Sequence, residues 1–286
     1  GPPPCLEQGL YTDLHERRPG RAATGFYCNY PLVIAMKRLT IFPLLLNIST
    51  LMFSFAGQYT PVYQKGSLVY SNTLADTSAL RGWVMEGPGT LRFSDGWMEM
   101  QAQAEEWHHV LWCPEPFPDS FIAEWEVQNL DTDAGLLIVF FAAAGINGED
   151  IFDPSLPPRD GTFSGYTKGR INSYHISYYA NNPKNPAREL AHLRKNSGFE
   201  LVQTGTEGIP KASPAVHRAR LIKDRGHILF FIDGRKIIDW RDDGKMHGPA
   251  LGSGKIGFRQ MQWSHFRYRN FNVWNLVNTH REKHGN

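Results

Sequence analysis

The feature that most constrains the fold is a long series of short segments in which apolar and polar residues alternate, or which are solidly apolar. They run from Tyr59 onward and are separated by Gly, Pro, Asn and Asp. A period of two residues is typical of strands that bury one face, and no long amphipathic helix interrupts the series. Eleven segments are predicted as strands: 97–101, 109–113, 121–127, 136–142, 173–179, 199–204, 217–223, 227–232, 236–240, 255–261 and 269–274.

The segment 121–127 shows how such a strand divides into two faces. Its apolar side chains alternate with Glu124 and Glu126. Because successive side chains of a strand point to opposite sides, one face is buried and the other meets solvent. Further along the chain, Asp233-Gly234 between two apolar runs predicts a tight hairpin. The whole pattern predicts an all-β fold, a two-sheet antiparallel β-sandwich or jelly roll.

A secretory signal precedes the predicted strands. Met36 is followed by Lys37 and Arg38, by an apolar run over 39–55 and by the small residues 56–57, which are the parts of a signal peptide. The run is short and has no basic stop after it, which argues against a membrane anchor. We predict an exported protein, periplasmic or extracellular, with no stable membrane span after signal cleavage. Its parts are a doubtful leader over 1–35, a signal peptide over 36–57, a single domain over 58–278 and a polar tail over 279–286.

Charge and cysteine content argue against a nucleic-acid partner and against an internal disulfide in the predicted domain. The 30 basic and 28 acidic residues give a net charge of +2, which is too small to indicate a nucleic-acid partner. Only Cys113 of the three cysteines lies within 58–278, so the predicted domain has no internal disulfide and depends on a large core. Its apolar neighbours predict a buried, inert thiol.

The segment 173–179 contains candidate acid–base residues. Alternation places His175, Ser177 and Tyr179 on one side of the strand. An imidazole and a phenol exchange protons with a sugar hydroxyl or an activated carbon, which is the chemistry of general acid–base catalysis. The alternative is that both side chains only make hydrogen bonds on a solvated face.

Two arginines are candidates for binding a carboxylate. Arg194 shares a side with alternate residues if its segment is extended, and Arg259 is predicted to point away from the core. A guanidinium binds a carboxylate through two parallel hydrogen bonds, which holds a uronate and acidifies the carbon beside it. Gln260 joins Arg259 only at a bulge or a strand end. The alternative is a surface strand with salt bridges.

The longest stretch without a strand pattern runs from 145 to 170 and is rich in functional residue types. Long structured loops in compact domains are usually functional. Its acids suit a hard cation such as Ca²⁺, but the spacing of a calcium loop is missing, and His108-His109 lacks a third zinc ligand. No metal site and no cofactor are predicted. The polar and aromatic residues of the stretch are Asn147, Glu149, Asp150, Asp153, Arg159, Asp160, Tyr166, Lys168 and Arg170.

Glu124 and Glu126 are a candidate catalytic pair for glycoside hydrolysis. They lie on one face about 7 Å apart by strand rise, and glycosidases use two acids that flank the scissile bond. The alternative is that two acids on an exposed strand face are simply solvated.

Seven motifs together resemble the YesU-like family of concanavalin A/galectin-type β-sandwich proteins, which occur with bacterial polysaccharide-utilisation genes. The resemblance spans residues 97 to 274, and its motifs are distinctive only in combination. It implies the fold class that the strand pattern predicts independently. The motifs are Trp112-Cys-Pro, Phe140-Phe-Ala, Gly148-Glu-Asp-Ile-Phe-Asp, Tyr174-His-Ile-Ser-Tyr-Tyr, Leu193-Arg-Lys-Asn-Ser-Gly-Phe, Gly257-Phe-Arg-Gln-Met and Tyr268-Arg-Asn-Phe.

The resemblance implies the processing of acidic oligosaccharides or polysaccharides such as ulvan or pectin, by a lyase or dehydratase that needs no cofactor. In this interpretation His175 and Tyr179 transfer protons, and Arg194, helped by Lys195 or Arg259, neutralises the carboxylate. A glycoside hydrolase and a non-catalytic, lectin-like binding module remain alternatives. The residues expected to bind the sugar are Trp107, Trp112, Glu149, Asp150, Arg159, Tyr166, Lys195, Arg259 and Gln260.

Overall fold

A computed structural model describes residues 62–104, 107–131, 135–181, 190–261 and 263–279. The chain divides into two units, Gly1–Gly57 and Gln58–Asn286, and all described residues lie in the second. The predicted leader, the predicted signal peptide and most of the polar tail therefore lie outside the described residues. Among the residues that are described, no helix reaches the length and apolar content needed to cross a membrane.

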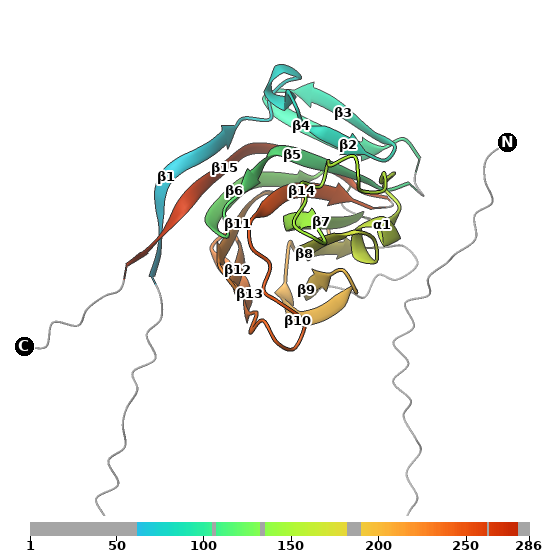
Figure 1. Ribbon diagram of the computed structural model, residues 1–286. Coiled ribbons are helices and arrows are strands. Elements are labelled where there is room, and N and C mark those ends of the chain that lie inside the picture. The colour runs from blue at the N-terminus through green and yellow to red at the C-terminus, as the bar shows by residue number, and fades with distance from the viewer. Residues whose placement is uncertain (1–61, 105–106, 132–134, 182–189, 262, 280–286) are drawn as a thin grey trace, which may run out of the picture. The chain divides into compact units, whose positions relative to one another are not determined.

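Two antiparallel sheets, called A and B, form the described fold (Figure 1). Sheet A has, in hydrogen-bonded order, β13 (Arg235–Arg241), β12 (His227–Ile232), β11 (Val216–Asp224), β6 (Ser120–Asn129), β15 (His265–Thr279), β4 (Trp97–Ala102) and β3 (Gly89–Ser94), and β1 (Val62–Asn72) also pairs with β15. Sheet B has β10 (Glu200–Glu207), β9 (Leu190–Asn196), β8 (Ile171–Asn181), β7 (Gly135–Gly145), β14 (Gly254–Gln260), β5 (His109–Phe117) and β2 (Val84–Glu86). Two short helices, η1 (Ser78–Leu80) and α1 (Phe163–Thr167), complete the described elements.

Every segment predicted as a strand overlaps a strand of the structure, so the all-β sandwich is confirmed. The strands β1, β2, β3 and β9 overlap none of the eleven predicted segments. Register shifts along β1 break its alternation, and β2 has only three residues, so neither carries a clear period of two. The extended conformation that Arg194 required is confirmed as β9.

The space between the sheets is filled by a large apolar core centred on Trp125. Its indole lies 5.4–6.4 Å, between ring centroids, from the rings of Tyr178, Phe230, Phe258 and Phe271, which come from both sheets. All five side chains are essentially inaccessible to solvent. Removing a buried aromatic of this kind costs about 3–5 kcal/mol, so the packing around Trp125 is a major contribution to the stability of the described fold.

Two local predictions are confirmed. Asp233 and Gly234 both have positive φ angles, 52° and 79°, and join β12 to β13, as a two-residue hairpin turn requires. Cys113 is a buried free thiol, and burial raises its pKa to about 11. A thiol that stays protonated at neutral pH is inert as a nucleophile.

Candidate functional site

The candidate site lies on the outer face of sheet B, the face turned away from sheet A. The β7–β8 loop, residues 146–170, packs on this face and contains α1 (Figure 1). Ile151, Leu156 and Tyr166 of the loop form an apolar cluster with strand residues that include Trp112 and Phe140. A stretch with no strand pattern thus packs firmly over part of the outer face of sheet B, because its apolar side chains are buried there.

A buried ion pair fastens this loop to the edge of sheet B. Arg159 donates from Nε and Nη2 to the two carboxylate oxygens of Glu86, at 3.1 and 2.6 Å, and Nη2 also donates to the carbonyl of Ile151. Trp112 donates its indole N–H to the same carboxylate at 2.9 Å. Glu86 therefore accepts hydrogen bonds from both the loop residue Arg159 and the strand residue Trp112. Its two bonds with Arg159 have the strong bidentate geometry of a guanidinium and a carboxylate.

Arg259 lies beneath the loop, and none of its surface is exposed. Its Cζ lies 4.9 Å from the ring centroids of both Phe163 and Tyr166, and Nη2 donates to the carbonyl of Gly161 at 2.9 Å. Nε and Nη1 have no hydrogen-bond partner in the described part of the chain. Burial lowers the pKa of Arg259 to about 10, so the guanidinium remains charged at neutral pH and holds the loop by cation–π contacts.

His175 lies at the centre of the same face with 2% of its surface exposed. Its ring stacks on Phe199, with centroids 5.8 Å apart and planes at 26°, and meets Phe140 and Phe163 edge-on at 5.2 and 6.1 Å. The side-chain amide nitrogen of Asn196 lies 2.9 Å from Nδ1. This contact orients the ring, and Nδ1 carries the imidazole proton only when the amide oxygen of Asn196, rather than its nitrogen, faces it.

Arg194 pairs with His175 across the β8–β9 ladder, so both side chains point to the outer face. Its Cζ lies 4.0 Å from the ring centroid of Phe199, and Nη1 donates to the carbonyl of Phe199 at 2.9 Å. Arg194 is half-buried, in contrast to Arg259. The predicted base and the predicted carboxylate-binding residue are therefore neighbours on one face and contact the same aromatic ring.

Comparison with known proteins assigns the chain to a family. A model of the family described as "Domain of unknown function (DUF1961)" matches residues 67–273. The chain belongs to the DUF1961 family. The "Uncharacterized protein YesU" of Bacillus subtilis (strain 168) is 42% identical over 219 residues, which cover 76% of this chain and 99% of YesU. The predicted YesU-like resemblance is thereby confirmed.

Solved structures support the same fold for this DUF1961 protein. A crystal structure of a protein of unknown function with a galectin-like fold from Bacillus subtilis is 41% identical, with a TM-score of 0.74, and the match covers 76% of this chain and all of that chain. The lumenal domain of VIP36 in its Ca²⁺/mannose-bound form gives a TM-score of 0.51 at 11% identity, covering 75% of this chain and 94% of that one. The latter shows a shared fold only.

The structure contradicts the predicted placement of Tyr179 in this DUF1961 protein. The register between β7 and β8 shifts between Ser177 and Tyr179, so Tyr178 is an extra residue and the alternation slips by one. Tyr179 therefore points into the core between the sheets, where its ring meets Phe266 edge-on at 5.4 Å. His175 and Tyr179 are on opposite sides of sheet B, and the predicted acid–base pair does not form.

Lys195 and Gln260 also point away from the outer face. Nζ of Lys195 donates to Asp242 at 2.6 Å and to the carbonyls of Gly248 and Pro249, which accounts for its three donors. The amide of Gln260 donates to the hydroxyl of Tyr268, a core residue, at 3.1 Å. Strand parity sets both orientations, because each side chain follows a residue that faces outward. Their predicted sugar-binding roles are wrong for this arrangement.

The acids of the β7–β8 loop stabilise turns in the described structure. Glu149 accepts from the amide and side chain of Asn147 at 2.9 and 2.7 Å, and hydrogen bonds from its own amide and from Asn147 lower its pKa. Asp150 pairs with Lys255 at 3.0 Å. No group of three or more His, Cys, Asp or Glu side chains is placed to hold a metal ion among the described residues. Trp107, just before β5, is 42% exposed.

Glu124 and Glu126 lie on the outer face of sheet A, where cations hold both. Glu124 bonds Arg220 at 2.5 Å and Lys65 at 2.8 Å, and Glu126 bonds Arg269 at 2.5 Å. Burial raises the pKa of Glu124, but the hydrogen bonds and charges of Lys65 and Arg220 outweigh it, and the net shift is downward. A general acid of a glycosidase needs the opposite shift, so the pair does not fit that role.

Sequence reasoning missed the aromatic residues that complete the site. Phe163 and Phe199 flank His175, yet one lies in an irregular loop and the other in the turn before β10, with a φ of 62°. Glu86 was also not singled out, and Asn196 was noted only for sharing a side with His192 and Arg194 in an extended segment. Their roles depend on contacts between distant segments, and no spacing along the chain signals such contacts.

Proposed function

We propose that this protein is an exported carbohydrate-active enzyme, a lyase or dehydratase, that carries out elimination on a uronic acid at the outer face of sheet B. The observation that carries the proposal is the pairing of His175 with Arg194 across adjacent strands on one face. Sandwich geometry brings an imidazole and a guanidinium together there, beside a loop that forms a wall of aromatic side chains.

The two side chains supply the groups that elimination needs. Arg194 binds the uronate carboxylate and stabilises the negative charge that develops when the carbon beside it loses its proton. His175 accepts that proton through Nε2 in the tautomer that carries its own proton on Nδ1, with the side-chain amide of Asn196 turned so that its oxygen accepts from Nδ1–H. The C5–H and C4–O bonds break, a C4=C5 double bond forms, and the imidazolium returns the proton to the departing oxygen. A dehydratase releases water in this step, and a lyase releases the hydroxyl end of a sugar chain.

This mechanism differs from the sequence prediction in its proton donor. Tyr179 lies in the core, so the imidazolium formed in the first half of the reaction is the acid of the second half. A single group can serve in this way when the proton and the leaving oxygen depart from the same side of the sugar ring. Phe163 and Phe199, both half-buried, border the ring of His175 and would limit the directions from which a sugar reaches it.

The test is an assay of unsaturated uronate on a panel of uronic oligosaccharides, by ultraviolet absorbance and mass spectrometry. Wild-type protein is expected to form the product, with His175→Ala and Arg194→Ala reducing kcat/KM by about a hundredfold or more. His247→Ala and Arg225→Ala, in loops outside this face, are the matched controls and are expected to keep full activity. Full activity in His175→Ala would overturn the mechanism. Loss of one water with the chain length unchanged identifies a dehydratase.

A second candidate is a non-catalytic, lectin-like module. The near-complete burial of His175 favours it, because a binding face needs no accessible base. Calorimetric binding of the same oligosaccharides without turnover would establish this function and exclude the enzymatic one.

A further inference from the structure

We propose that the outer face of sheet A is a second carbohydrate-binding site, which takes a chain of sugars that carries carboxylates. Two adjoining hollows of about 510 and 300 Å³ lie on this face and share Glu126 and Arg218. They cross β12, β11, β6, β15 and β1, which are hydrogen-bonded neighbours in that order. Four strand spacings of about 4.8 Å make this track about 19 Å long, enough for a short oligosaccharide.

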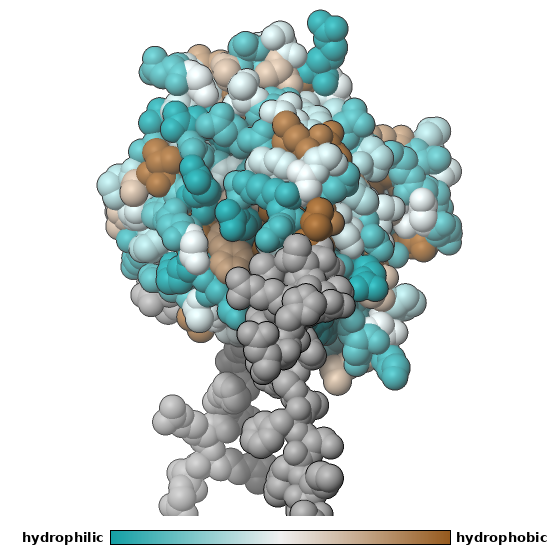
Figure 2. All heavy atoms as spheres, turned by 90° about the vertical axis from the view of Figure 1, so that its left-hand side faces the viewer, coloured by the Kyte–Doolittle hydropathy of each residue, from teal (hydrophilic) through white to brown (hydrophobic). Residues whose placement is uncertain are grey.

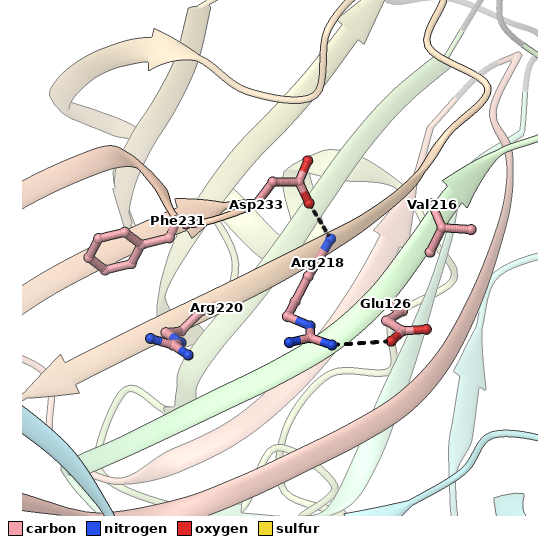
Figure 3. Close-up of a pocket in the computed structure, with 7 residues that line it drawn as sticks. Glu126, Val216, Arg218, Arg220, Phe231 and Asp233 are labelled. Carbon is pink, nitrogen blue, oxygen red and sulfur yellow. Dashed lines mark hydrogen bonds and ion pairs between the residues drawn. The ribbon is translucent and has the colours of Figure 1, made fainter.

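Two carboxylates of the track, Glu124 and Glu126, are paired with cations, and a third, Asp233, accepts from the backbone amide of Arg218 and contacts the ring of His217. Two guanidinium groups of the track keep N–H groups that these carboxylates do not use. Glu124 has Arg220 and Lys65 as partners, and Glu126 has Arg269 at 2.5 Å. Arg218 reaches Glu126 only at 3.7 Å, which is longer than a hydrogen bond, and 65% of its side chain is exposed. Figure 3 shows the two side chains turned toward each other along the hollow. Arg218 is therefore available to a carboxylate from outside the protein.

Arg220 offers the same chemistry one strand step away. Its Nε donates to Glu124 at 2.5 Å, and Nη1 and Nη2 have no partner among the residues that the structure describes. Glu124 orients the guanidinium of Arg220 through Nε and leaves Nη1 and Nη2 free to donate to a ligand. Because Arg218 and Arg220 are two residues apart on β11, they lie on the same face, about 7 Å apart by strand rise. Two oriented cations at that spacing suit successive acidic groups of a polymer.

Ring faces and amides along the track favour a sugar over a simple anion as the ligand. Phe231, the cross-strand partner of Arg220, and Trp274 are half-buried at the two hollows. Asn270 and Asn272 add amide donors and acceptors to the second hollow. Alternating rings, amides and charges are the groups that stack on sugar rings and bond their hydroxyls. The coloured surface on the side of the molecule that carries β1 and β15 is largely hydrophilic (Figure 2).

This second site shares its ligand class with the proposed function but none of its residues. His175 and Arg194 belong to sheet B, whereas the track belongs to sheet A. A polymer held on sheet A would raise the local concentration of sugar chains near the proposed active site on sheet B. The effective affinity of the protein for the polymer then increases without a new contact in that active site. Either proposal can therefore fail while the other stands.

The experiment is calorimetric titration with hexagalacturonate as the acidic probe, cellohexaose as the neutral probe and hexaglutamate as a non-sugar polyanion. His175→Gln is titrated beside wild-type protein, so that turnover does not consume the probe. Arg218→Ala with Arg220→Ala is the test variant, and Arg218→Ala alone is the second, because its exposed side chain makes no hydrogen bond that folding needs. Arg225→Ala is the matched control, since Arg225 is 75% exposed and lies outside both hollows.

Hexagalacturonate is expected to bind more tightly than the other two probes, and to lose about tenfold or more in affinity in the double variant and several-fold in Arg218→Ala. Arg225→Ala is expected to bind as the wild type does. Wild-type affinity in both arginine variants would overturn the inference, as would equal binding of hexagalacturonate and hexaglutamate. Elimination assays on the double variant keep the two proposals apart, because the reaction rate on a monomeric or dimeric uronate is expected to be unchanged.

Discussion

His175 and Phe199 stack with their ring centroids 5.8 Å apart and their planes at 26°. Phe199 lies in the turn between β9 and β10, with the guanidinium of Arg194 4.0 Å from its ring centroid. One aromatic ring therefore positions both groups that the proposed elimination uses. It does so from a turn whose backbone has a φ of 62°, a conformation that needs support from its neighbours.

Replacing Phe199 tests this arrangement. Phe199→Ala removes the contacts of this ring with His175, Arg194 and Phe163. We expect kcat/KM on a uronic oligosaccharide to fall about tenfold or more, because an imidazole displaced by an ångström loses its geometry for proton transfer. The loss in unfolding free energy is expected to be about 1 kcal/mol, the value of an aromatic pair at a half-buried position. Phe199→Tyr keeps the ring and is the control. Unchanged kinetics in Phe199→Ala would show that the stacking has no functional role.

Tyr179→Phe tests whether Tyr179 lies in the core, as in the structure, or beside His175, as simple alternation along the sequence predicts. The phenol lies in the core between the sheets, so we expect full activity and a loss of about 1 kcal/mol in unfolding free energy for the missing hydrogen bonds. Both are measured on one preparation, by the product assay and by urea denaturation. An inactive but folded Tyr179→Phe would restore the pairing of His175 with Tyr179 that alternation predicts.

The fold was predictable because a period of two residues survives in most strands, as in β6, where Trp125 faces the core and Glu124 points to the outer side of sheet A. The candidate site was predictable only in part. Alternation placed His175 and Arg194 correctly, but one extra residue in β8 reversed Tyr179. Phe163 and Asn196 reach His175 from segments distant in sequence, so only the assembled sheet shows them. A local sequence pattern predicts to which side of a strand a side chain points, but not which residues of other segments it contacts there.

Asp242 is expected to control stability at low pH. It accepts hydrogen bonds from Lys195 at 2.6 Å and from Tyr174 at 2.5 Å. Burial raises the pKa of Asp242, but these hydrogen bonds outweigh burial, so its pKa in the folded protein is lowered. The carboxylate therefore contributes its full stability above the unfolded pKa of about 3.9 and loses it as pH falls through the lower, folded value.

Asp242→Asn leaves the ammonium of Lys195 buried without a counter-charge, which is expected to cost about 3–5 kcal/mol at neutral pH. The variant is also expected to lose less stability than the wild type on acidification below about pH 4. Urea denaturation across pH measures both effects. Asp243→Asn is the control, because that neighbouring acid bonds only the amides of its own turn. Equal losses in the two variants would remove the special role of the Lys195 ion pair.

Gly161 is expected to be the position at which the β7–β8 loop tolerates no side chain. Its φ is 93°, and a Cβ there would lie well inside 3.0 Å of the carbonyl oxygen of His108. Gly161 also accepts the hydrogen bond of the buried Arg259. Gly161→Ala therefore combines backbone strain with a clash against another segment, and the loop must shift from sheet B to relieve it.

Gly148→Ala is the matched control, because Gly148 belongs to the same loop, has a φ of 89° and has open space where the Cβ would be. Backbone strain alone predicts a cost of about 1–2 kcal/mol for each variant. We expect Gly161→Ala to lose clearly more, with a lower Tm and faster proteolytic cleavage within residues 146–170. Since this loop supplies Phe163 to the ring of His175, kcat/KM is expected to fall as well. Equal stability and equal proteolysis in the two alanine variants would mean that the docked loop does not depend on the close approach at Gly161.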